Sequence, residues 1–238
     1  MDIYKINSIK ELTRDPYVGR GIIVGMSEDG KSAVAAYFIM GRSANSRNRV
    51  FAEHDGAVFT EPFDASKVED PSLIIYAAMR KIGKKLIVTN GDQTDTIVEG
   101  IRLGSDFSGA LRTREFEPDA PNLTPRISAE LDFSDGFGYK MSILKSEDEK
   151  GSQCARFTFD YAPIAGLGHF IHTYVGDGNP LPTFQGEPER VAIPDDIEAF
   201  SRDIWESLNE DNKISLLVRY TDIATGKTEQ KIINKYIK

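Results

Sequence analysis

The sequence lacks the features that would place it outside the cell or in a membrane. Cys154 is the only cysteine in 238 residues, so an intrachain disulfide is excluded and a reducing compartment is indicated. No run of about 18 apolar residues occurs, and the opening stretch MDIYKINSIKELTRD has no apolar core of a signal peptide. These absences predict a cytoplasmic protein that makes no contact with membranes.

A surplus of basic charge is also missing. The chain has 29 Lys and Arg against 37 Asp and Glu, a net charge of -8. Duplex nucleic acid is bound largely by neutralising its phosphates, so a general nucleic-acid binder is excluded, whereas a small phosphorylated ligand needs only a few local arginines. Apolar residues make up 40% of the chain and no linker interrupts it, which predicts one globular domain over residues 1–238.

Apolar periodicity predicts an α+β fold with mostly antiparallel sheets. Residues 19–27 and 32–40 read as two strands, and Glu28-Asp29-Gly30 between them is typical of a hairpin turn. No internal repeat is evident. Further strand-like runs are residues 84–89, 126–133, 139–145, 155–164, 169–175, 214–220 and 229–237.

Three helices are expected among these strands. The first begins at Pro71, capped by Asp70, and ends before Gly83; the second follows the turn Asn90-Gly91-Asp92 and ends near Gly104; the third begins near Pro194. The apolar positions of the first are Ile74, Tyr76, Met79 and Ile82, and those of the third are Ile197, Phe200, Ile204 and Leu208.

Two patterns suggest chemistry that their context disfavours. Residues 25–32, GMSEDGKS, have the spacing of a phosphate-binding loop, but that loop needs a helix beginning at Lys31, and the following residues read as a strand. A nucleotide triphosphatase would bind ATP and magnesium there. His169 and His172 would share one face of a helix, but on a strand they point to opposite faces, so we expect no metal site.

Four polar clusters outside the expected helices and strands are rich in side chains that read phosphates and amides. The second holds three arginines within eight residues, which suits one phosphate, although a solvated basic turn has the same composition. The clusters are residues 17–20, 41–49, 89–96 and 122–126.

In their order along the chain and in their residue patterns, these clusters resemble the motifs of the archaeal-type IMP cyclohydrolases. The family carries Tyr-x-Gly-Arg, an Arg-Ser loop ending in Asn and Arg, a helix entry with a tyrosine, Asn-Gly-x-x-Thr-Asp-Thr-Ile, and Thr-Pro-Arg-Ile. Here these motifs correspond to residues 17–20, 42–49, 70–76, 90–97 and 124–127, and the resemblance spans residues 16–130.

The resemblance implies a fold and a reaction. The fold is a four-layer αββα sandwich like that of the N-terminal nucleophile hydrolases. The reaction closes 5-formamidoimidazole-4-carboxamide ribotide to inosine 5'-monophosphate and water, without metal or cofactor. The implied partner is this small ribotide, and the oligomeric state, a homo-oligomer included, stays open. Amide hydrolysis by an N-terminal nucleophile is not expected, since Met1-Asp2 supplies no Ser, Thr or Cys.

Carried over residue by residue, the resemblance implies three catalytic groups. Arg47 polarises the formyl oxygen or holds phosphate, Tyr76 donates a proton to the developing oxyanion, and Glu117 accepts one from the carboxamide nitrogen. A two-residue shift of the loop would put Arg49 in place of Arg47, Glu115 or Asp119 are alternatives to Glu117, and core packing is the alternative role for Tyr76. The implied substrate-binding residues are Arg20, Arg42, Ser43, Asn48, Asn90, Asp92, Thr94, Asp95, Thr96, Asn122, Thr124 and Arg126.

Two alternatives to catalysis or binding remain. Asn90 and the threonines after it are also ordinary helix-capping residues. A protein that kept the pocket but lost the chemistry would be a purine-ribotide sensor of the same fold, and the sequence alone does not separate it from the enzyme.

Overall fold

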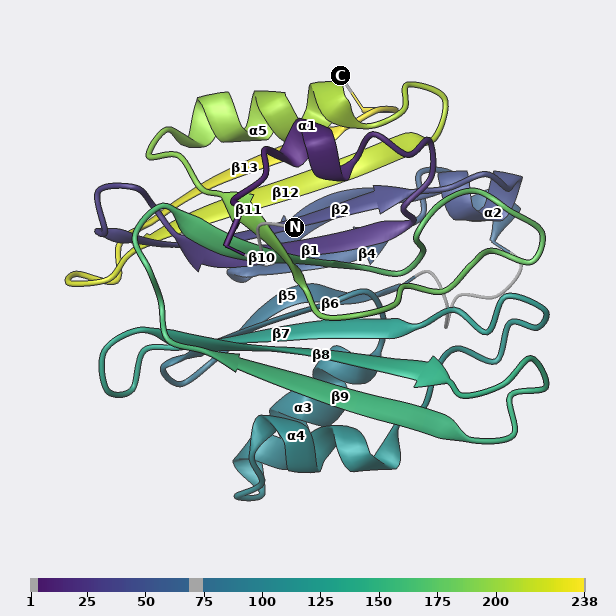
Figure 1. Ribbon diagram of the computed structural model, residues 1–238, viewed down its shortest axis with the longest axis horizontal. Coiled ribbons are helices and arrows are strands. Elements are labelled where there is room, and N and C mark those ends of the chain that lie inside the picture. The colour runs from purple at the N-terminus through teal and green to yellow at the C-terminus, as the bar shows by residue number, and fades with distance from the viewer. Residues whose placement is uncertain (1–3, 69–74, 238) are drawn as a thin grey trace.

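The computed structural model describes residues 4–68 and 75–237 as two antiparallel sheets stacked face to face (Figure 1). The first sheet has six strands in the order β11-β10-β1-β2-β12-β13. Its strands are β1 (Arg20–Met26), β2 (Ser32–Met40), β10 (Leu167–His172), β11 (Glu189–Ala192), β12 (Lys213–Asp222) and β13 (Thr228–Asn234).

The second sheet has seven strands in the sequential order β3-β4-β5-β6-β7-β8-β9. All neighbours pair antiparallel, so the sheet is a meander of hairpins interrupted by one helical excursion. Its strands are β3 (Val50–His54), β4 (Ala57–Glu61), β5 (Tyr76–Ile82), β6 (Lys85–Thr89), β7 (Arg126–Asp132), β8 (Gly138–Ser146) and β9 (Cys154–Tyr161).

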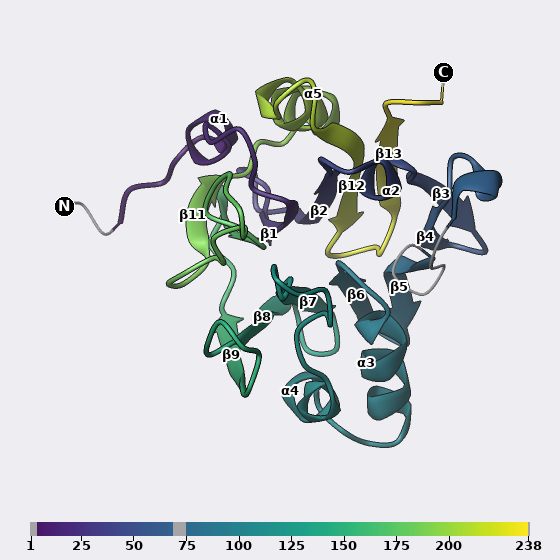
Figure 2. The same cartoon turned by 90° about the vertical axis from the view of Figure 1, so that its right-hand side faces the viewer.

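Helices cover the outer face of each sheet (Figure 2). α1 (Ile9–Leu12) and α5 (Ile197–Ser207) lie over the six-stranded sheet, and α3 (Gln93–Arg102) and α4 (Phe107–Ala110) lie over the seven-stranded sheet. The predicted α+β sandwich with mostly antiparallel sheets is confirmed. The short elements α2 (Ala44–Arg47), η1 (Ala65–Lys67) and η3 (Leu111–Thr113) lie in connections.

The position of strand β2 between two apolar layers explains why its sequence is apolar at nearly every position. Tyr37 and Ile39 face the core between the two sheets, while Phe38 and Met40 face the layer beneath α5. A strand buried on both faces has no alternation of polar and apolar residues. Phe200 of α5 packs in that outer layer, as its helical spacing predicted.

The predicted hairpin at residues 28–30 is confirmed. β1 and β2 pair in register from Arg20 opposite Ile39 to Met26 opposite Ala33. Lys31 is exposed, directly precedes a strand and forms an ion pair of 3.0 Å with Asp29, so the helix that a phosphate-binding loop requires is absent at this place.

The helix expected to end before Gly83 is wrong over residues 76–82, which form strand β5; its first positions, residues 70–74, lie outside the described residues. Ala78 faces the core between the sheets, and β5 is covered on the other side by α3, where Thr94 Oγ1 donates to the carbonyl of Ala77 at 2.6 Å. A strand covered on both faces has the same continuous apolar character as a buried helix, and a bulge opposite β4 disturbs its period further.

The two histidines lie on β10, with rings on opposite faces as predicted. The ring centroid of His169 is 3.6 Å from that of Tyr161 in the facing sheet, whereas His172 stacks on Phe170 at 4.6 Å. Among the residues that the structure describes, none of the helices is long and apolar enough to cross a membrane.

Candidate functional site

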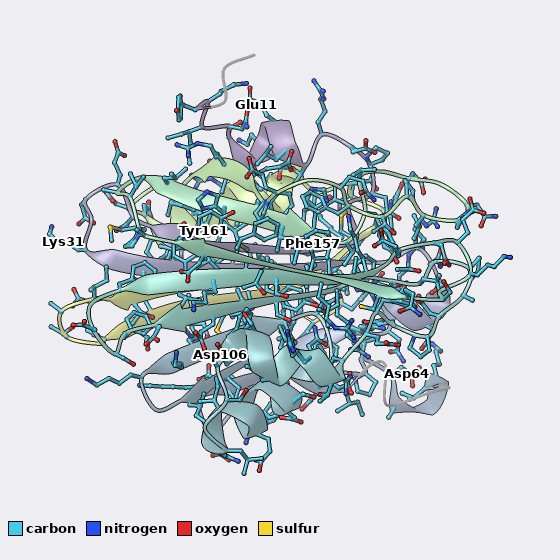
Figure 3. All side chains as sticks on the ribbon, turned by 60° about the horizontal axis from the view of Figure 1, so that its bottom comes forward. Glu11, Lys31, Asp64, Asp106, Phe157 and Tyr161 are labelled. Carbon is cyan, nitrogen blue, oxygen red and sulfur yellow. The ribbon has the colours of Figure 1, made fainter. Side chains whose placement is uncertain are left out.

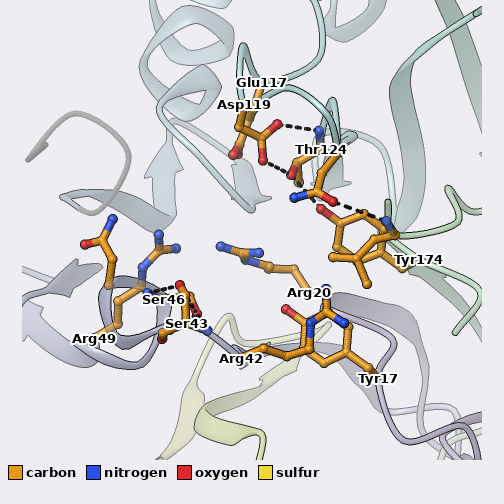
Figure 4. A pocket seen from close by; sticks show the side chains of 13 residues that line it. Tyr17, Arg20, Arg42, Ser43, Ser46, Arg49, Glu117, Asp119, Thr124 and Tyr174 are labelled. Atoms are coloured by element: carbon orange, nitrogen blue, oxygen red, sulfur yellow. Dashed lines mark hydrogen bonds between the residues drawn. The ribbon is translucent and has the colours of Figure 1, made fainter. Parts of the chain in front are cut away.

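A polar cavity of about 260 Å³ lies at one end of the sandwich, where loops from both sheets meet (Figure 4). Four segments build it: the start of β1, the loop between β2 and β3, the loop before β7 and the loop between β10 and β11. The lining residues are Tyr17, Arg20, Arg42, Ser43, Asn45, Ser46, Arg49, Glu117, Asp119, Asn122, Thr124, Tyr174 and Leu181.

Arg20 and Arg49 give the cavity a concentrated positive charge. Their side chains reach into it from the start of β1 and from the loop between β2 and β3 (Figure 4), although the residues are only 9% and 5% exposed. The Nε atom of each is buried without a hydrogen-bond partner, and neither forms an ion pair within residues 4–68 and 75–237. Burial, then the charge of Arg20, lowers the pKa of Arg49. Two like charges in a buried place, with no ion pair to a described residue, favour an anionic ligand that would bind both.

Glu117 lies across the cavity from these arginines (Figure 4). Burial raises the pKa of the Glu117 carboxyl, and the charge of Arg20, then that of Arg126, opposes the rise. Its backbone N–H donates to the carbonyl of Thr124 at 2.8 Å, which fixes the loop beneath it. A carboxylate with a raised pKa, close to arginines but in no ion pair with a described residue, is suited to accept a proton.

The loop that carries Glu117 is fastened to the loop between β10 and β11. Asp119 accepts a hydrogen bond of 2.7 Å from the backbone N–H of Thr124. The hydroxyls of Thr124 and Tyr174 are 2.6 Å apart, and Asn122 accepts from the backbone N–H of Leu181 at 3.2 Å. The two loops therefore hold one wall of the cavity in place.

An aromatic pair and a third arginine form the adjacent wall. The rings of Tyr17 and Tyr174 are stacked with their centroids 6.0 Å apart. The guanidinium of Arg42 lies 5.0 Å from the centre of the Tyr17 ring and forms an ion pair with Asp177 at the rim. Because Arg42 is already paired and exposed, its charge is weaker inside the cavity than those of Arg20 and Arg49.

Tyr76 is buried close to the charged groups but does not line the cavity. Its hydroxyl is 2.7 Å from that of Tyr37. Burial raises the pKa of Tyr76, while the charges of Arg49 and Arg20 oppose the rise. Tyr76 therefore keeps its proton at neutral pH and lies within electrostatic reach of Arg49.

Of the two arginines between which the sequence left a choice, the structure places Arg49 in the cavity. Arg47 turns away: its Nε donates to the carbonyl of Gly41 at 3.1 Å and its Nη2 to Asn212 at 3.5 Å. Asn48 also points elsewhere, since its side-chain amide forms hydrogen bonds of 2.8 and 2.7 Å with the backbone of Asp64. Arg47 and Asn48 shape the loop rather than line the cavity.

The residues predicted from the Asn-Gly motif lie behind the cavity wall. Asn90 donates to the carbonyl of Pro125 and accepts from the N–H of Ile127, each at 2.9 Å, so both ends of its amide are used by the backbone. Thr94 is buried against β5 through its bond to Ala77. These side chains brace the start of α3 and of β7 and do not line the cavity.

Arg126 and Asp92 extend this bracing. Arg126 pairs with Asp92 at 2.7 Å, and Arg114 contacts the same carboxylate at 2.5 Å. Asp95 is exposed and forms an ion pair of 2.7 Å with Arg80, and Thr96 is half-buried on α3 away from the lining residues. Of the substrate-binding residues predicted from the sequence, the structure brings five into the cavity: Arg20, Arg42, Ser43, Asn122 and Thr124.

Residues 17–227 match the family model described as IMP cyclohydrolase-like protein, which is most of the chain. The chain belongs to this family. An IMP cyclohydrolase of Methanopyrus kandleri is 34% identical over 116 residues, 47% of this chain and 57% of the relative. Those of Methanocaldococcus jannaschii and Methanococcus aeolicus are 33% and 31% identical over 57% and 66% of this chain and 70% and 74% of the relatives. The aligned part thus spans little more than half of the M. kandleri protein.

The family match extends beyond residue 130, where sequence reasoning found only general strand character, and this part supplies Tyr174 and Leu181 to the cavity. The run GDGNPLP after β10 was the available signal, because loops rich in Gly, Asp, Asn and Pro that follow a strand often carry function. The contact between Tyr174 and Thr124 could not be predicted from the sequence, because the two residues are 50 positions apart.

Gly19, in the Tyr-x-Gly-Arg motif of this family, has two reasons to be glycine. Its φ is +76°, and a Cβ would stand 2.2 Å from Thr173 Oγ1. We expect Gly19→Ala to lower the free energy of unfolding by at least about 3 kcal/mol in urea titrations. Gly56→Ala is the control: φ is +77° but nothing lies within 4 Å, so the cost should be only about 1 kcal/mol. Equal losses would mean that the close approach at Gly19 is unimportant.

Proposed function

We propose that the protein is an IMP cyclohydrolase that closes 5-formamidoimidazole-4-carboxamide ribotide to inosine 5'-monophosphate and releases water. The observation that carries the proposal is the pair of buried arginines, Arg20 and Arg49, which form no ion pair with a described residue and face the carboxyl of Glu117 across a polar cavity. Membership of the IMP cyclohydrolase-like family supports the same activity.

The reaction requires groups that move protons and stabilise charge. The carboxamide nitrogen attacks the formyl carbon and loses one proton, while the formyl oxygen gains one and becomes a hydroxyl. That hydroxyl then leaves as water as the formamido nitrogen loses its proton, and the six-membered ring is complete. Holding the two groups in contact supplies much of the acceleration, since effective molarities for well-oriented neighbours reach about 10⁵ M or more.

In this proposal the cavity divides these tasks between its two sides. Arg20 and Arg49 bind anionic oxygen, either the ribotide phosphate or the oxygen on which charge develops at the formyl carbon. Glu117, on the opposite side, takes the proton from the attacking nitrogen. Tyr76 retains its proton, with its hydroxyl bound to Tyr37, and donates toward the charged oxygen if the substrate displaces Tyr37 from it.

The purified protein incubated with the ribotide and a chelator should form inosine monophosphate, followed by ultraviolet absorbance. The substitution Glu117→Gln should reduce turnover, because it removes the carboxylate. Tight ribotide binding without turnover in the parent would instead indicate a non-catalytic ribotide sensor, for which the anion-binding arginines alone would suffice. If the parent neither binds nor converts the ribotide, the proposal is overturned.

The remaining expectations accompany this function as proposals. We place the enzyme in the cytoplasm, where the free thiol of Cys154 is stable. We also propose that the chain is one domain, related in fold to the N-terminal nucleophile hydrolases; one apolar core shared by both sheets supports this.

A further inference from the structure

Strand β9 leaves one edge of the seven-stranded sheet open. It is the last strand in the sheet order, and Figure 2 shows it at the lower margin of its sheet with no strand beyond it. Phe157 is 45% exposed, and Figure 3 shows Phe157 and Tyr161 along this strand at the face turned to the viewer. An exposed edge of eight residues offers a row of backbone N–H and C=O groups to another strand.

Two of the other edges, those of β3 and β11, carry contacts to their backbone within the described part of the chain. At the far end of the same sheet, the Asn234 side chain of β13 bonds to both backbone groups of Phe51 in β3, at 2.8 and 3.0 Å. β11 is bridged by the segment before α1, where Asn7 exchanges backbone hydrogen bonds of 3.1 and 2.9 Å with Arg190 and Ala192. At eight residues, β9 is the longest of the four edge strands that the structure describes.

The sequence of β9 is complementary to itself when reversed. Around Thr158 it reads Arg-Phe-Thr-Phe-Asp from Arg156 to Asp160. If a second copy runs antiparallel with Thr158 opposite Thr158, Arg156 stands opposite Asp160 and Phe157 opposite Phe159, twice each. Within one copy Arg156 lies 3.6 Å from Glu115 and Asp160 lies 3.2 Å from Lys140, so these exposed ion pairs would be exchanged for, or shared with, the pairs across the axis. Opposite charges and aromatic pairs placed directly across two strands both stabilise the pairing.

Neighbouring registers lose this match. Residues directly opposite in an antiparallel pair share a face, so the register can shift only in steps that keep the core face inward. Moving by one such step sets Arg156 or Asp160 against Thr158 and removes both charge pairs. The pairing centred on Thr158 is thus the one that the charges select.

We propose that two copies of this chain associate through β9, antiparallel about a two-fold axis at Thr158, so that their seven-stranded sheets become continuous. Both α4 helices then lie on one side of the joined sheet, since Ser108 of α4 contacts Thr158 at 3.3 Å. No residue of β9 lines the cavity, so this association is independent of the proposed chemistry.

A cysteine at the axis tests the register directly. In a Cys154→Ser background, Thr158→Cys places two thiols opposite each other, with Cβ atoms about 5 Å apart, close enough for a disulfide. Mild oxidation should convert most of the protein to a covalent dimer. Ala155→Cys in the same background is the matched control, because its two copies would be about 20 Å apart along the strands and should remain uncross-linked. Equal cross-linking of both variants, or none of Thr158→Cys, would overturn the register.

Charge exchange tests the association without a covalent bond. Sedimentation over a range of concentrations should give a dimer for the parent, and Arg156→Asp or Asp160→Arg alone should weaken it about tenfold or more by placing like charges opposite. The double exchange should restore the dimer, whereas Glu229→Arg on β13 should leave it unchanged. A parent that stays monomeric, or a double exchange that restores nothing, would overturn the proposal. Turnover measured on the same monomeric variants should persist, which separates this outcome from failure of the proposed function.

Discussion

Replacing Glu117 with glutamine should lower kcat by about 10²–10⁴-fold and leave the Kd for the ribotide within a few-fold of the parent. The amide keeps the size and hydrogen-bonding capacity of the side chain but does not accept the proton of the attacking nitrogen. Calorimetry would give the Kd and ultraviolet absorbance the kcat. Glu115→Gln is the matched control: Glu115 is exposed and forms an ion pair of 3.6 Å with Arg156.

The pH dependence provides a second readout of the same residue. Burial raises the pKa of Glu117 above the ordinary 4.5, and a base works only when ionised. The kcat/KM should therefore fall as the pH drops through that raised pKa, at a higher pH than an unperturbed glutamate would give, and the limb should disappear in Glu117→Gln. An acid limb that persists unchanged in the variant would assign the proton transfer to another group.

The same shift has a consequence for stability. The folded protein holds the proton of Glu117 more tightly than the unfolded chain does, so its contribution to stability is present at low pH and is lost as the pH rises through the folded pKa. Above the folded pKa the ionised carboxylate is a cost to the fold. Glu117→Gln should then be at least as stable as the parent at a pH above the folded pKa, which would also show that lost turnover is not lost folding.

Local pattern was sufficient for much of the fold. The Asp29-Gly30 turn, the α5 face at Phe200 and the alternation along β7 to β10 each depend on neighbours in sequence, and the structure confirms them. β5 was missed because burial on both of its faces removes the period that distinguishes a strand from a helix. The hairpin of β3 and β4 was also not predicted, because its residues are partly exposed and show only a weak alternation of apolar and polar side chains.

The candidate site could be located from sequence only in part. Its motifs pointed to the right loops, because glycine and arginine clusters are confined to special backbone and charge environments, and Arg20 and Glu117 do meet in the cavity. Which side chain of a cluster faces inward depends on tertiary contacts. Asn90 was expected to meet a ligand, but the backbone of β7 uses both ends of its amide. Tyr174 joins through a pairing across about 50 residues, which no local pattern records.

Arg49→Met should lose ribotide affinity but no stability, whereas Arg47→Met should lose stability but little affinity, although the two arginines are only two residues apart. Loss of Arg49 removes a charged donor from the cavity, worth about 1.5–3 kcal/mol per hydrogen bond, so ribotide affinity should fall about 10–100-fold or more. It also removes a buried charge that repels Arg20, so the free energy of unfolding without ligand should stay equal or rise.

Arg47→Met should leave ribotide affinity within a few-fold and cost about 1 kcal/mol of stability, because its bonds to Gly41 and Asn212 hold the loop and not a ligand. Calorimetry with the ribotide and urea titration of both variants would check this. Inorganic phosphate adds a probe that needs no turnover: it should raise the Tm of the parent and of Arg47→Met, and raise that of Arg49→Met much less. Loss of binding in Arg47→Met with full binding in Arg49→Met would place the ribotide elsewhere. Loss of binding in Arg49→Met with full binding in Arg47→Met would mean that Arg20 and Arg49 bind the substrate. The unfavourable repulsion between these two charges would then be retained in the fold because the bound substrate neutralises it.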